Sequence, residues 1–390
     1  MFKRPLLHIA LSSAIALSAF SALSAQAQTV DANAVVQQYA NLVYANYSDT
    51  LSSAKAMQKA ITDFTKAPSA QGLEHAKKAW LAAREVYGQT EAFRFYSGPI
   101  DSDTGPEGRL NSWPLDESYI DSVSGKPNAG IINNPKVKIT KANLAKLNER
   151  GGEENIAAGW HAIEFLLWGQ DQSDTGPGNR SFEDYVDSNT AAANADRRRA
   201  FLNTATELLV DDLSTLVKAW QPAGKNYRAK FEKGGIASVR KMIVGMGSLS
   251  RGELAGERLE VAMNTQDKED EHSCFSDNTH RDVVNNAQGI ENVWLGHYKR
   301  LDGSVVQGAS LKDLVAAKNT AVAERVSQQM AQSVAHAQAI QPPFDREIVG
   351  AKDATGRLRV QKTIDSLVQQ SKDLTEAAAT LGITKLAQTK

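Results

Sequence analysis

The feature that most constrains the fold of this chain is a set of long segments in which apolar residues recur every three or four positions. Residues 33–64 show it most clearly: they contain no proline or glycine and carry the series Val35, Tyr39, Leu42, Val43, Tyr47 and Leu51. This spacing places the apolar side chains along one face of an α-helix. The same spacing predicts helices over residues 69–96, 140–150, 155–168, 182–187, 194–220, 234–263, 281–300, 310–340 and 357–381.

The predicted fold class is all-α, organised as two helical-bundle domains packed side by side. Alternating apolar and polar residues, which would indicate strands, are absent, and several long helices are typical of up-and-down bundles. A break lies at 221–235, because the sequence between two helices there contains one proline and three glycines. We therefore expect an N-terminal domain over residues 28–225 and a C-terminal domain over residues 226–390.

Residues 1–27 have the features of a cleavable signal peptide. Lys3 and Arg4 form a basic start, residues 6–23 are mostly apolar or small, and Ala25-Gln-Ala27 is a small-x-small cleavage site. No later stretch approaches the length of apolar sequence that spans a bilayer. We expect cleavage after Ala27 and a periplasmic or secreted protein without a membrane span; a transmembrane anchor at residues 6–23 is the alternative, and this run is short for one.

Charge and cysteine content narrow the classes of function. Loss of Lys3 and Arg4 reduces the 44 basic residues to 42, against 45 acidic ones, so the mature chain has a formal charge of −3. This balance disfavours a broad nucleic-acid-binding surface. Cys274 is the only cysteine, so no internal disulfide can form and stability must come from burial.

A long loop and a short repeat stand out between the predicted helices. Residues 97–138 contain five prolines, and structured loops of this length are often functional. The pentapeptide Ser-Asp-Thr-Gly-Pro occurs at 102–106 and again at 173–177, each time after a helix with polar candidate residues. Two related site loops and two unrelated Asp/Gly/Pro turns are equally good interpretations.

The most informative stretch is Gly-Trp-His-Ala-Ile-Glu-Phe-Leu-Leu-Trp-Gly at residues 159–169. His161 and Glu164 are three residues apart, which places an imidazole and a carboxylate on one face of a helix. Within such an apolar run, both groups are costly to bury unless they pair with something or hold a metal. The spacing alone leaves open a core histidine that hydrogen-bonds a neighbour.

A second polar group lies on the preceding long helix. Arg84, Tyr87, Glu91 and Arg94 follow at steps of three, four and three, so they share one stripe. A solvated face with helical ion pairs is one interpretation. The helix is apolar over much of its circumference, however, and this favours a narrow polar seam with a functional role.

The predicted helix from Ile236 to Met263 carries glycines on one face. Gly245, Gly252 and Gly256 each cost helix stability, so we expect another element to pack closely there. Its acidic residues at steps of four and three are Glu253, Glu257 and Glu260. They could supply a ligand to a hard cation or form a solvated charged face.

Residues 270–280 crowd two histidines, three acids, one cysteine and several hydroxyls between two helices. No zinc-like spacing is present. Asp277 or Asn278 would serve as the N-cap of the following helix. We therefore expect a mainly structural segment with one contact to the site.

Taken together, these segments resemble the imelysin family, and in particular its iron-regulated branch. The motifs that carry the resemblance are Gln89-Thr-Glu91-Ala-Phe-Arg94-Phe, Gly159-Trp-His161-Ala-Ile-Glu164, Gly252-Glu-Leu-Ala-Gly256-Glu257-Arg258, Glu271-His-Ser-Cys-Phe-Ser-Asp277-Asn-Thr279 and Pro343-Phe-Asp345. They follow the family order and span most of the mature chain.

The resemblance implies an exported helical protein in which the Gly-x-His-x-x-Glu motif faces a cleft between two bundles. It also implies a link to iron acquisition and kinship with periplasmic components of ferrous-iron uptake, with His161 and Glu164 as metal ligands. We add Glu91 and Glu257 as expected further ligands. Side chains expected to contact the ligand or to support the metal ligands are Arg84, Arg94, Arg258 and Asp277.

The leading hypothesis is a protein that binds a divalent or trivalent metal ion, expected to be iron, or its chelate and serves an iron-uptake component of the inner or outer membrane. Histidine with carboxylates suits iron, manganese or zinc better than copper(I). The family name also implies a metallopeptidase, but the chain has no His-Glu-x-x-His and the motif supplies two of the three ligands needed. A metal-free module that binds its ligand through the Trp and Arg groups is the third hypothesis.

Overall fold

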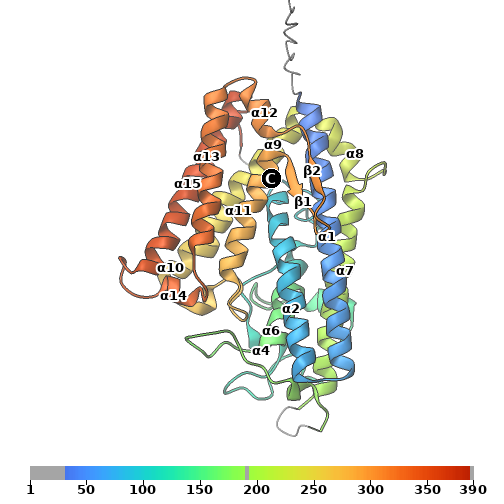
Figure 1. The fold of residues 1–390 in the computed structure, drawn as a ribbon. Helices are drawn as coiled ribbons and strands as arrows, with labels where there is room; N and C mark the ends of the chain where they lie inside the picture. Colours follow the sequence, from blue (N-terminus) through green and yellow to red (C-terminus); the bar gives the residue numbers. More distant parts are fainter. Residues whose placement is uncertain (1–30, 189–192, 387–390) are drawn as a thin grey trace, which may run out of the picture.

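The computed structural model describes residues 31–188 and 193–386, in which helices are the predominant regular structure and strands are almost absent (Figure 1). The all-α fold class is therefore confirmed. The expected signal peptide at residues 1–27 lies outside the described residues.

The first half of the chain is built around its longest helix, α1 (Ala32–Lys66). The helices α2 (Ala70–Tyr87) and α7 (Ala195–Trp220) both pack along α1 (Figure 1). The shorter helix α6 (Gly159–Trp168), which carries the Gly-x-His-x-x-Glu motif, contacts both α2 and α7. The motif is thereby held inside the helical layer and not on an exposed loop.

In the second half, α13 (Thr320–Ala339) and α15 (Thr355–Thr380) form the outer pair (Figure 1). The central helix α11 (Thr279–Leu295) packs against α13 and against the short helix η1 (Gly88–Phe93), which continues α2. This contact between α11 and η1 joins the two halves.

The helix predicted over residues 234–263 consists of three consecutive parts. They are α9 (Ile236–Ser248), the π-helical stretch η4 (Leu249–Glu260) and α10 (Val261–Thr265). π-Helical turns are rare and often occur at functional sites. Here η4 packs against α15 and α11, and it carries Arg258 into the interior.

The remaining elements of the described residues are short. They are α3 (Glu107–Leu110), α4 (Glu117–Ile120), α5 (Lys141–Leu147), η2 (Phe182–Tyr185), α8 (Tyr227–Phe231), η3 (Glu232–Gly234), η5 (Lys268–Asp270), α12 (Leu311–Ala316) and α14 (Asp345–Ile348).

Helix starts are fixed by polar side chains that accept a hydrogen bond from the first turn. Asp31 accepts from the backbone N–H of Ala34, and Ser69 accepts from that of Gly72. Such caps satisfy backbone donors that have no partner within the helix. They explain why α1 and α2 begin where the sequence changes from loop to apolar periodicity.

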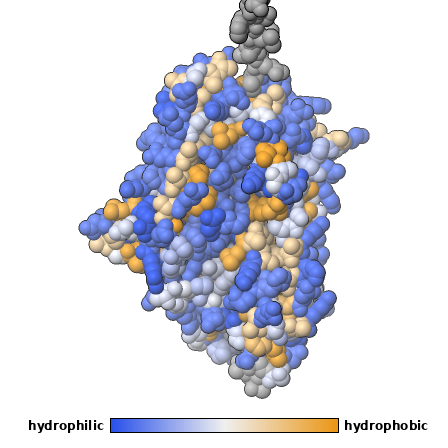
Figure 2. Space-filling view, viewed as in Figure 1, coloured by the Kyte–Doolittle hydropathy of each residue, from blue (hydrophilic) through white to orange (hydrophobic). Residues whose placement is uncertain are grey.

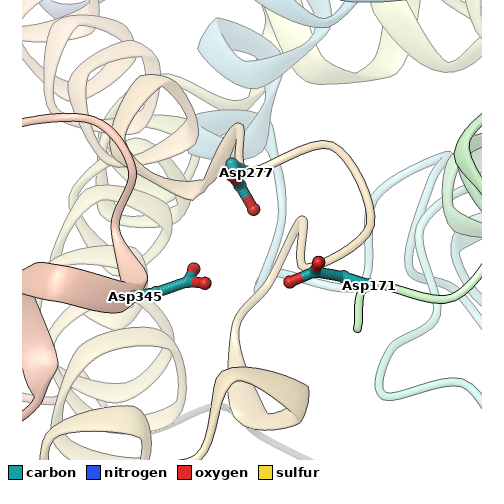
Figure 3. Close-up of side chains that lie close together, drawn as sticks. All are labelled: Asp171, Asp277 and Asp345. Atoms are coloured by element: carbon teal, nitrogen blue, oxygen red, sulfur yellow. The ribbon is translucent and has the colours of Figure 1, made fainter. Parts of the chain in front are cut away.

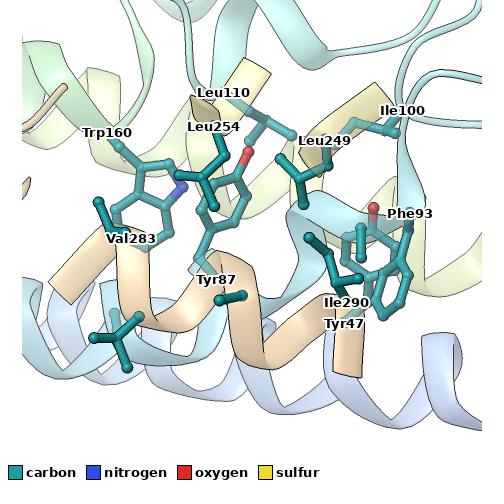
Figure 4. Close-up of a cluster of buried hydrophobic side chains, with 14 of the residues drawn as sticks. Tyr47, Tyr87, Phe93, Ile100, Leu110, Trp160, Leu249, Leu254, Val283 and Ile290 are labelled. Carbon is teal, nitrogen blue, oxygen red and sulfur yellow. The ribbon is translucent and has the colours of Figure 1, made fainter. Parts of the chain in front are cut away.

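One cluster of buried apolar side chains is continuous from α1 to α15. Figure 4 shows the part where the halves meet, with Tyr47 of α1, Trp160 of α6, Leu254 of η4 and Ile290 of α11. The expected break at 221–235 does coincide with the interval between α7 and α9. Since both halves share this core, the division into two domains at that interval stays a prediction.

The structure corrects the helix predicted over residues 281–300. α11 ends at Leu295, where Gly296 adopts a φ of 59°. The chain then forms an antiparallel hairpin of β1 (His297–Lys299) and β2 (Val305–Gln307), with Tyr298 paired to Val306. Strands this short carry too little alternation to be seen in the sequence.

We expected another element to pack closely along the glycine face of the 234–263 helix, and one does so at Gly245 but not at Gly252. A Cβ on Gly245 would lie 2.9 Å from the carbonyl oxygens of Ala92 and Arg94, so η1 crosses α9 there. Gly252 has no neighbour within 4 Å of a Cβ. Glycine in the π-helical part therefore has no packing explanation.

The face of the molecule in Figure 2 is mainly hydrophilic, with apolar groups in small separate patches. Within the described residues, no helix combines the length and apolar character that crossing a bilayer requires.

Candidate functional site

The Gly-x-His-x-x-Glu helix is buried over its whole length. All ten residues of α6 are inaccessible to solvent or nearly so. Gly159 begins it with a φ of 88°, and a Cβ at that position would lie 2.5 Å from the carbonyl oxygen of Leu110. Only glycine accepts both conditions, so this residue of the motif sets the position of α6.

His161 and Glu164 form a direct pair, with His161 Nδ1 lying 2.9 Å from Glu164 Oε2. The other oxygen of Glu164 accepts hydrogen bonds from the backbone N–H and the hydroxyl of Ser276, at 2.9 and 2.7 Å. Burial raises the pKa of Glu164 to about 8, against the opposing effect of Ser276 and Arg84. Burial also lowers the pKa of His161 well below its usual value, with Arg84 adding to the effect.

The second ring nitrogen of His161 is left without a partner. His161 Nε2 is buried, and no described residue hydrogen-bonds to it. A buried polar nitrogen in this state is costly, and metal-ligating histidines commonly show the arrangement seen here, with a carboxylate at the opposite ring nitrogen.

A second histidine–carboxylate pair lies beside the first. His272 Nδ1 is 2.7 Å from Asp282 Oδ2, and the hydroxyl of Ser273 donates to the same oxygen at 2.5 Å. The rings of His161 and His272 meet edge to face with centroids 4.7 Å apart. Burial lowers the pKa of His272 to about 3, helped by Arg258 and opposed by Asp282. His272 is therefore neutral at physiological pH and able to act as a ligand.

Arg84 balances the charge of this cluster. It donates to Asp282 Oδ2 at 3.0 Å and to Asn111 Oδ1 at 2.7 Å. Its guanidinium lies 5.3 to 5.7 Å from the ring centroids of Trp80, Tyr87 and Trp160, a cation–π cage. Although burial opposes ionisation, Arg84 and His272 hold the pKa of Asp282 well below its usual range.

Glu91 belongs to a neighbouring ion-pair network. Its Oε2 accepts from Arg94 and Arg258, both at 2.6 Å, and Arg258 also donates to Glu253 at 2.9 Å. Burial would raise the pKa of Glu91, but the two guanidinium groups hold it below its usual range. The stripe is buried and is not a solvated face, but a functional role for it stays a prediction, and Glu91 is already engaged by two arginines.

The two predicted residues of the second half lie apart from the histidines. Glu257 is exposed and lines a surface pocket with Phe95 and Arg251. Asp277 is buried, but its carboxylate gathers with those of two other aspartates and not with Glu164. The structure thus brings His161, Glu164 and Arg84 together, sets Glu91, Arg94 and Arg258 beside them, and separates Glu257 and Asp277 from them.

His272 also lines a small pocket that opens beside the pair. This acidic pocket has a volume of about 240 Å³, and its walls are His272, Asn111, Ser112, Trp113, Arg94, Glu107, Glu149, Glu153 and Glu253. Glu107 and Glu253 are paired with Arg94 and Arg258, at 2.8 and 2.9 Å, so Glu149 and Glu153 are the carboxylates that favour the entry of a cation. His161 lies behind His272 as seen from this pocket, since its ring contacts that of His272 while it is itself inaccessible.

Sequence reasoning missed His272 and its partners Asp282 and Ser273, and it missed Ser276, which donates to Glu164. Asp282 lies in the first turn of α11, where an acidic residue is ordinary because it stabilises the helix N-terminus. Ser273 and Ser276 sit in the segment 270–280, which was expected to be mainly structural. The burial of every residue from 271 to 279 is the property that distinguishes this loop, and it has no signature in the sequence.

An all-helical fold built around a buried Gly-x-His-x-x-Glu helix defines the class of protein to which this chain is to be compared. The Imelysin family profile, whose family name carries the word peptidase, matches residues 43–374. The chain therefore belongs to the imelysin family.

Two of the similar proteins carry names that refer to iron. The chain is 26% identical over 352 residues to iron-regulated protein A of Synechococcus elongatus, covering 87% of this chain and 84% of that protein. A crystal structure from Parabacteroides distasonis, provisionally named an iron-regulated protein A precursor, has a TM-score of 0.68 at 19% identity and covers 92% of this chain and 97% of its own. An imelysin-like protein from Psychrobacter arcticum has a TM-score of 0.63 at 15% identity, with coverages of 90% and 96%. These two structures share the fold.

Proposed function

We propose that this imelysin-family protein is exported and binds an iron ion at the floor of the acidic pocket, in the service of iron uptake. The ion is held by ring nitrogens of His161 and His272. The single observation that carries the proposal is the buried Nε2 of His161, which has no hydrogen-bond partner while Glu164 occupies the opposite ring nitrogen.

The two histidines fit a metal in their chemistry. Burial keeps both rings neutral, and each Nδ1 contacts a carboxyl group, Glu164 or Asp282. When ionised, such a group accepts from Nδ1–H and leaves Nε2 as the ligand atom. Imidazole nitrogen suits iron, and water would fill the remaining positions. Glu164 then acts through His161, because its Oε2 lies 2.9 Å from His161 Nδ1 and its Oε1 accepts from the Ser276 N–H.

Electrostatics of the approach also support a cation. Four glutamates line the acidic pocket, and Arg84 is neutralised by Asp282 at 3.0 Å. A ferrous or ferric ion would thus pass glutamate side chains as it enters the pocket. At the histidines it would reach a polar cluster in which the charge of Arg84 is paired with that of Asp282. The leader-like residues 1–27 support export, and the family and the name of the cyanobacterial relative support the link to iron.

The size of the acidic pocket favours an ion over the alternatives. Its volume of about 240 Å³ is below the range of about 300–1,000 Å³ typical of small-molecule sites. A peptidase would need room for a polypeptide beside the metal, and a binding module would need room for an organic ligand. No observation of the described residues favours either function.

The test is a calorimetric titration of the metal-stripped protein with ferrous ion under anaerobic conditions. We expect one binding site that is lost in His161→Ala. His75→Ala, which removes an exposed histidine on α2, is the matched control and should bind as the wild type does. Equal affinity in His161→Ala and the wild type would overturn the proposal.

A further inference from the structure

Three buried aspartates converge at a point outside the histidine site. Asp171 follows α6, Asp277 precedes α11, and Asp345 begins α14. One carboxylate oxygen from each lies within 4.8 Å of the others, and Figure 3 shows the side chains pointing toward one another. The three side chains come from distant segments and meet only in the folded protein.

Two of these carboxylates have no donor. Asp277 and Asp345 are 6% and 7% exposed, and no amide, hydroxyl or cationic group of the described residues donates to any of their four oxygens. Buried carboxylates are normally paired or coordinate a metal, because an uncompensated charge is costly to take out of water. The cluster therefore lacks a positive partner that its geometry is able to hold.

A fourth acid adds to the deficit. Glu271 is fully buried next to Asp345, and burial and the Asp345 carboxyl raise its pKa well above the usual value, while the hydroxyl of Thr279 opposes the shift. Among the described residues, the cation that reaches the group is Lys268, whose Nζ lies 3.2 Å from Asp171 Oδ2. Burial, together with the charges of Asp345 and Asp171, raises the pKa of Asp277 to about 7. Four acids thus face one ammonium group.

We propose that Asp171, Asp277 and Asp345, with Glu271 beside them, form a binding site for Ca²⁺. All the donors are oxygens, with no histidine or thiolate among them, and this set suits a hard cation. Calcium accepts several protein carboxylates in irregular geometry, whereas Mg²⁺ requires a near-ideal octahedron and usually keeps its waters. A surface pocket of about 390 Å³ lined by Asp345, Lys268 and Asp174 gives the ion access.

The position of this site gives the ion a structural role. It would tie the loop after α6 and the start of α14 to the segment 271–278. That segment also carries His272 and Ser276, which contact His161 and Glu164. The calcium site shares no residue with the iron site, so it stands or falls independently of the proposed function.

The test is a calorimetric titration of the chelator-treated full-length protein with CaCl₂ at pH 7.5, together with melting temperatures in Ca²⁺ and in chelator. We expect one site in the wild type and a higher Tm with Ca²⁺, since a ligand that binds only the folded state stabilises it. Asp277→Asn/Asp345→Asn should weaken binding at least tenfold and abolish the Tm increase. In chelator this variant should melt no lower than the wild type, because the amides relieve carboxylate repulsion.

Two controls separate this site from other effects. Asp353→Asn removes an exposed carboxylate near α15. This variant should still show the heat of calcium binding and the increase in Tm with Ca²⁺. His161→Ala should also bind calcium and show the increase in Tm, even when it no longer binds iron. Absence of binding and of any Tm change in the wild type at millimolar Ca²⁺ would overturn the proposal and identify the cluster as protonated carboxyl groups. Undiminished binding in the double variant, or in Asp277→Asn alone if the double variant does not fold, would also overturn it.

Discussion

His161 and His272 come from distant parts of the chain, yet their rings meet edge to face with centroids 4.7 Å apart. Each carries a carboxylate at Nδ1, Glu164 at 2.9 Å and Asp282 at 2.7 Å. Two oriented, neutral imidazoles side by side are rarely needed for packing alone. This relationship is the basis for placing the metal between the motif helix and the segment that precedes α11.

Replacement of His272 should weaken iron binding although this residue lies outside the Gly-x-His-x-x-Glu motif. We expect His272→Ala to lower the affinity at least tenfold, the order of loss that follows removal of a ligand or its supporting group. Competition with a chromogenic ferrous chelator measures it. His280→Ala, in the first turn of α11 where the ring contacts the backbone carbonyl of Asp277, is the control. An unchanged affinity in His272→Ala would restrict the site to His161.

The motif glycine should be required for the position of α6. Gly159→Ala adds both a strained positive φ and a clash with the Leu110 carbonyl, so we expect a loss of more than about 2 kcal/mol in the free energy of unfolding. Gly125→Ala shares a positive φ of 77° but has open space at Cβ, so it should lose less. Urea denaturation compares them, and equal losses would contradict the packing argument.

Arg198 should be a major contributor to stability. It donates to both oxygens of Asp121 at 2.6 and 2.9 Å, and both residues are buried, so the pair fastens the long 97–138 loop to α7. We expect Arg198→Ala to cost about 3–5 kcal/mol, because it leaves a buried carboxylate with less compensation. Lys141→Ala, which breaks an exposed pair with Asp211, should change little. Equal losses in the free energy of unfolding for the two variants, measured by denaturation, would contradict a major stabilising role for Arg198.

Acid should destabilise the protein partly through Glu91. Since Arg94 and Arg258 lower its folded-state pKa, its contribution is present above its unfolded pKa of about 4.3 and is lost as pH falls toward the folded value. Melting temperatures of the wild type should therefore fall more steeply between pH 5 and 3 than those of Glu91→Gln, which has no proton to take up. Parallel curves for the two proteins would show that Glu91 does not contribute.

Much of the fold could be predicted from the sequence because helical periodicity is a local signal. The helix expected at 33–64 is α1, and the one at 194–220 is α7. The prediction of a helix over 281–300 was wrong because Gly296 ends the helix early and a short hairpin follows it. The three-part 234–263 helix also shows that a π-helical stretch has no periodic signature of its own.

The site could be predicted only where its residues share one helix. His161 and Glu164 are paired because a three-residue spacing on a helix brings them together, and the contact of Glu91 with Arg94 has the same spacing although Arg94 lies just past the end of η1. Contacts between distant segments, such as His272 with His161 or Asp171 with Asp345, depend on how loops pack, and the sequence carries no local signal for that.

The most direct test of the central claim is anomalous diffraction at the iron edge from crystals of the iron-loaded protein. The proposal predicts a peak at about 2.0–2.2 Å from ring nitrogens of His161 and His272, which is the usual metal–nitrogen distance. An iron peak found only at Asp171, Asp277 and Asp345, or elsewhere on the molecule, would contradict it.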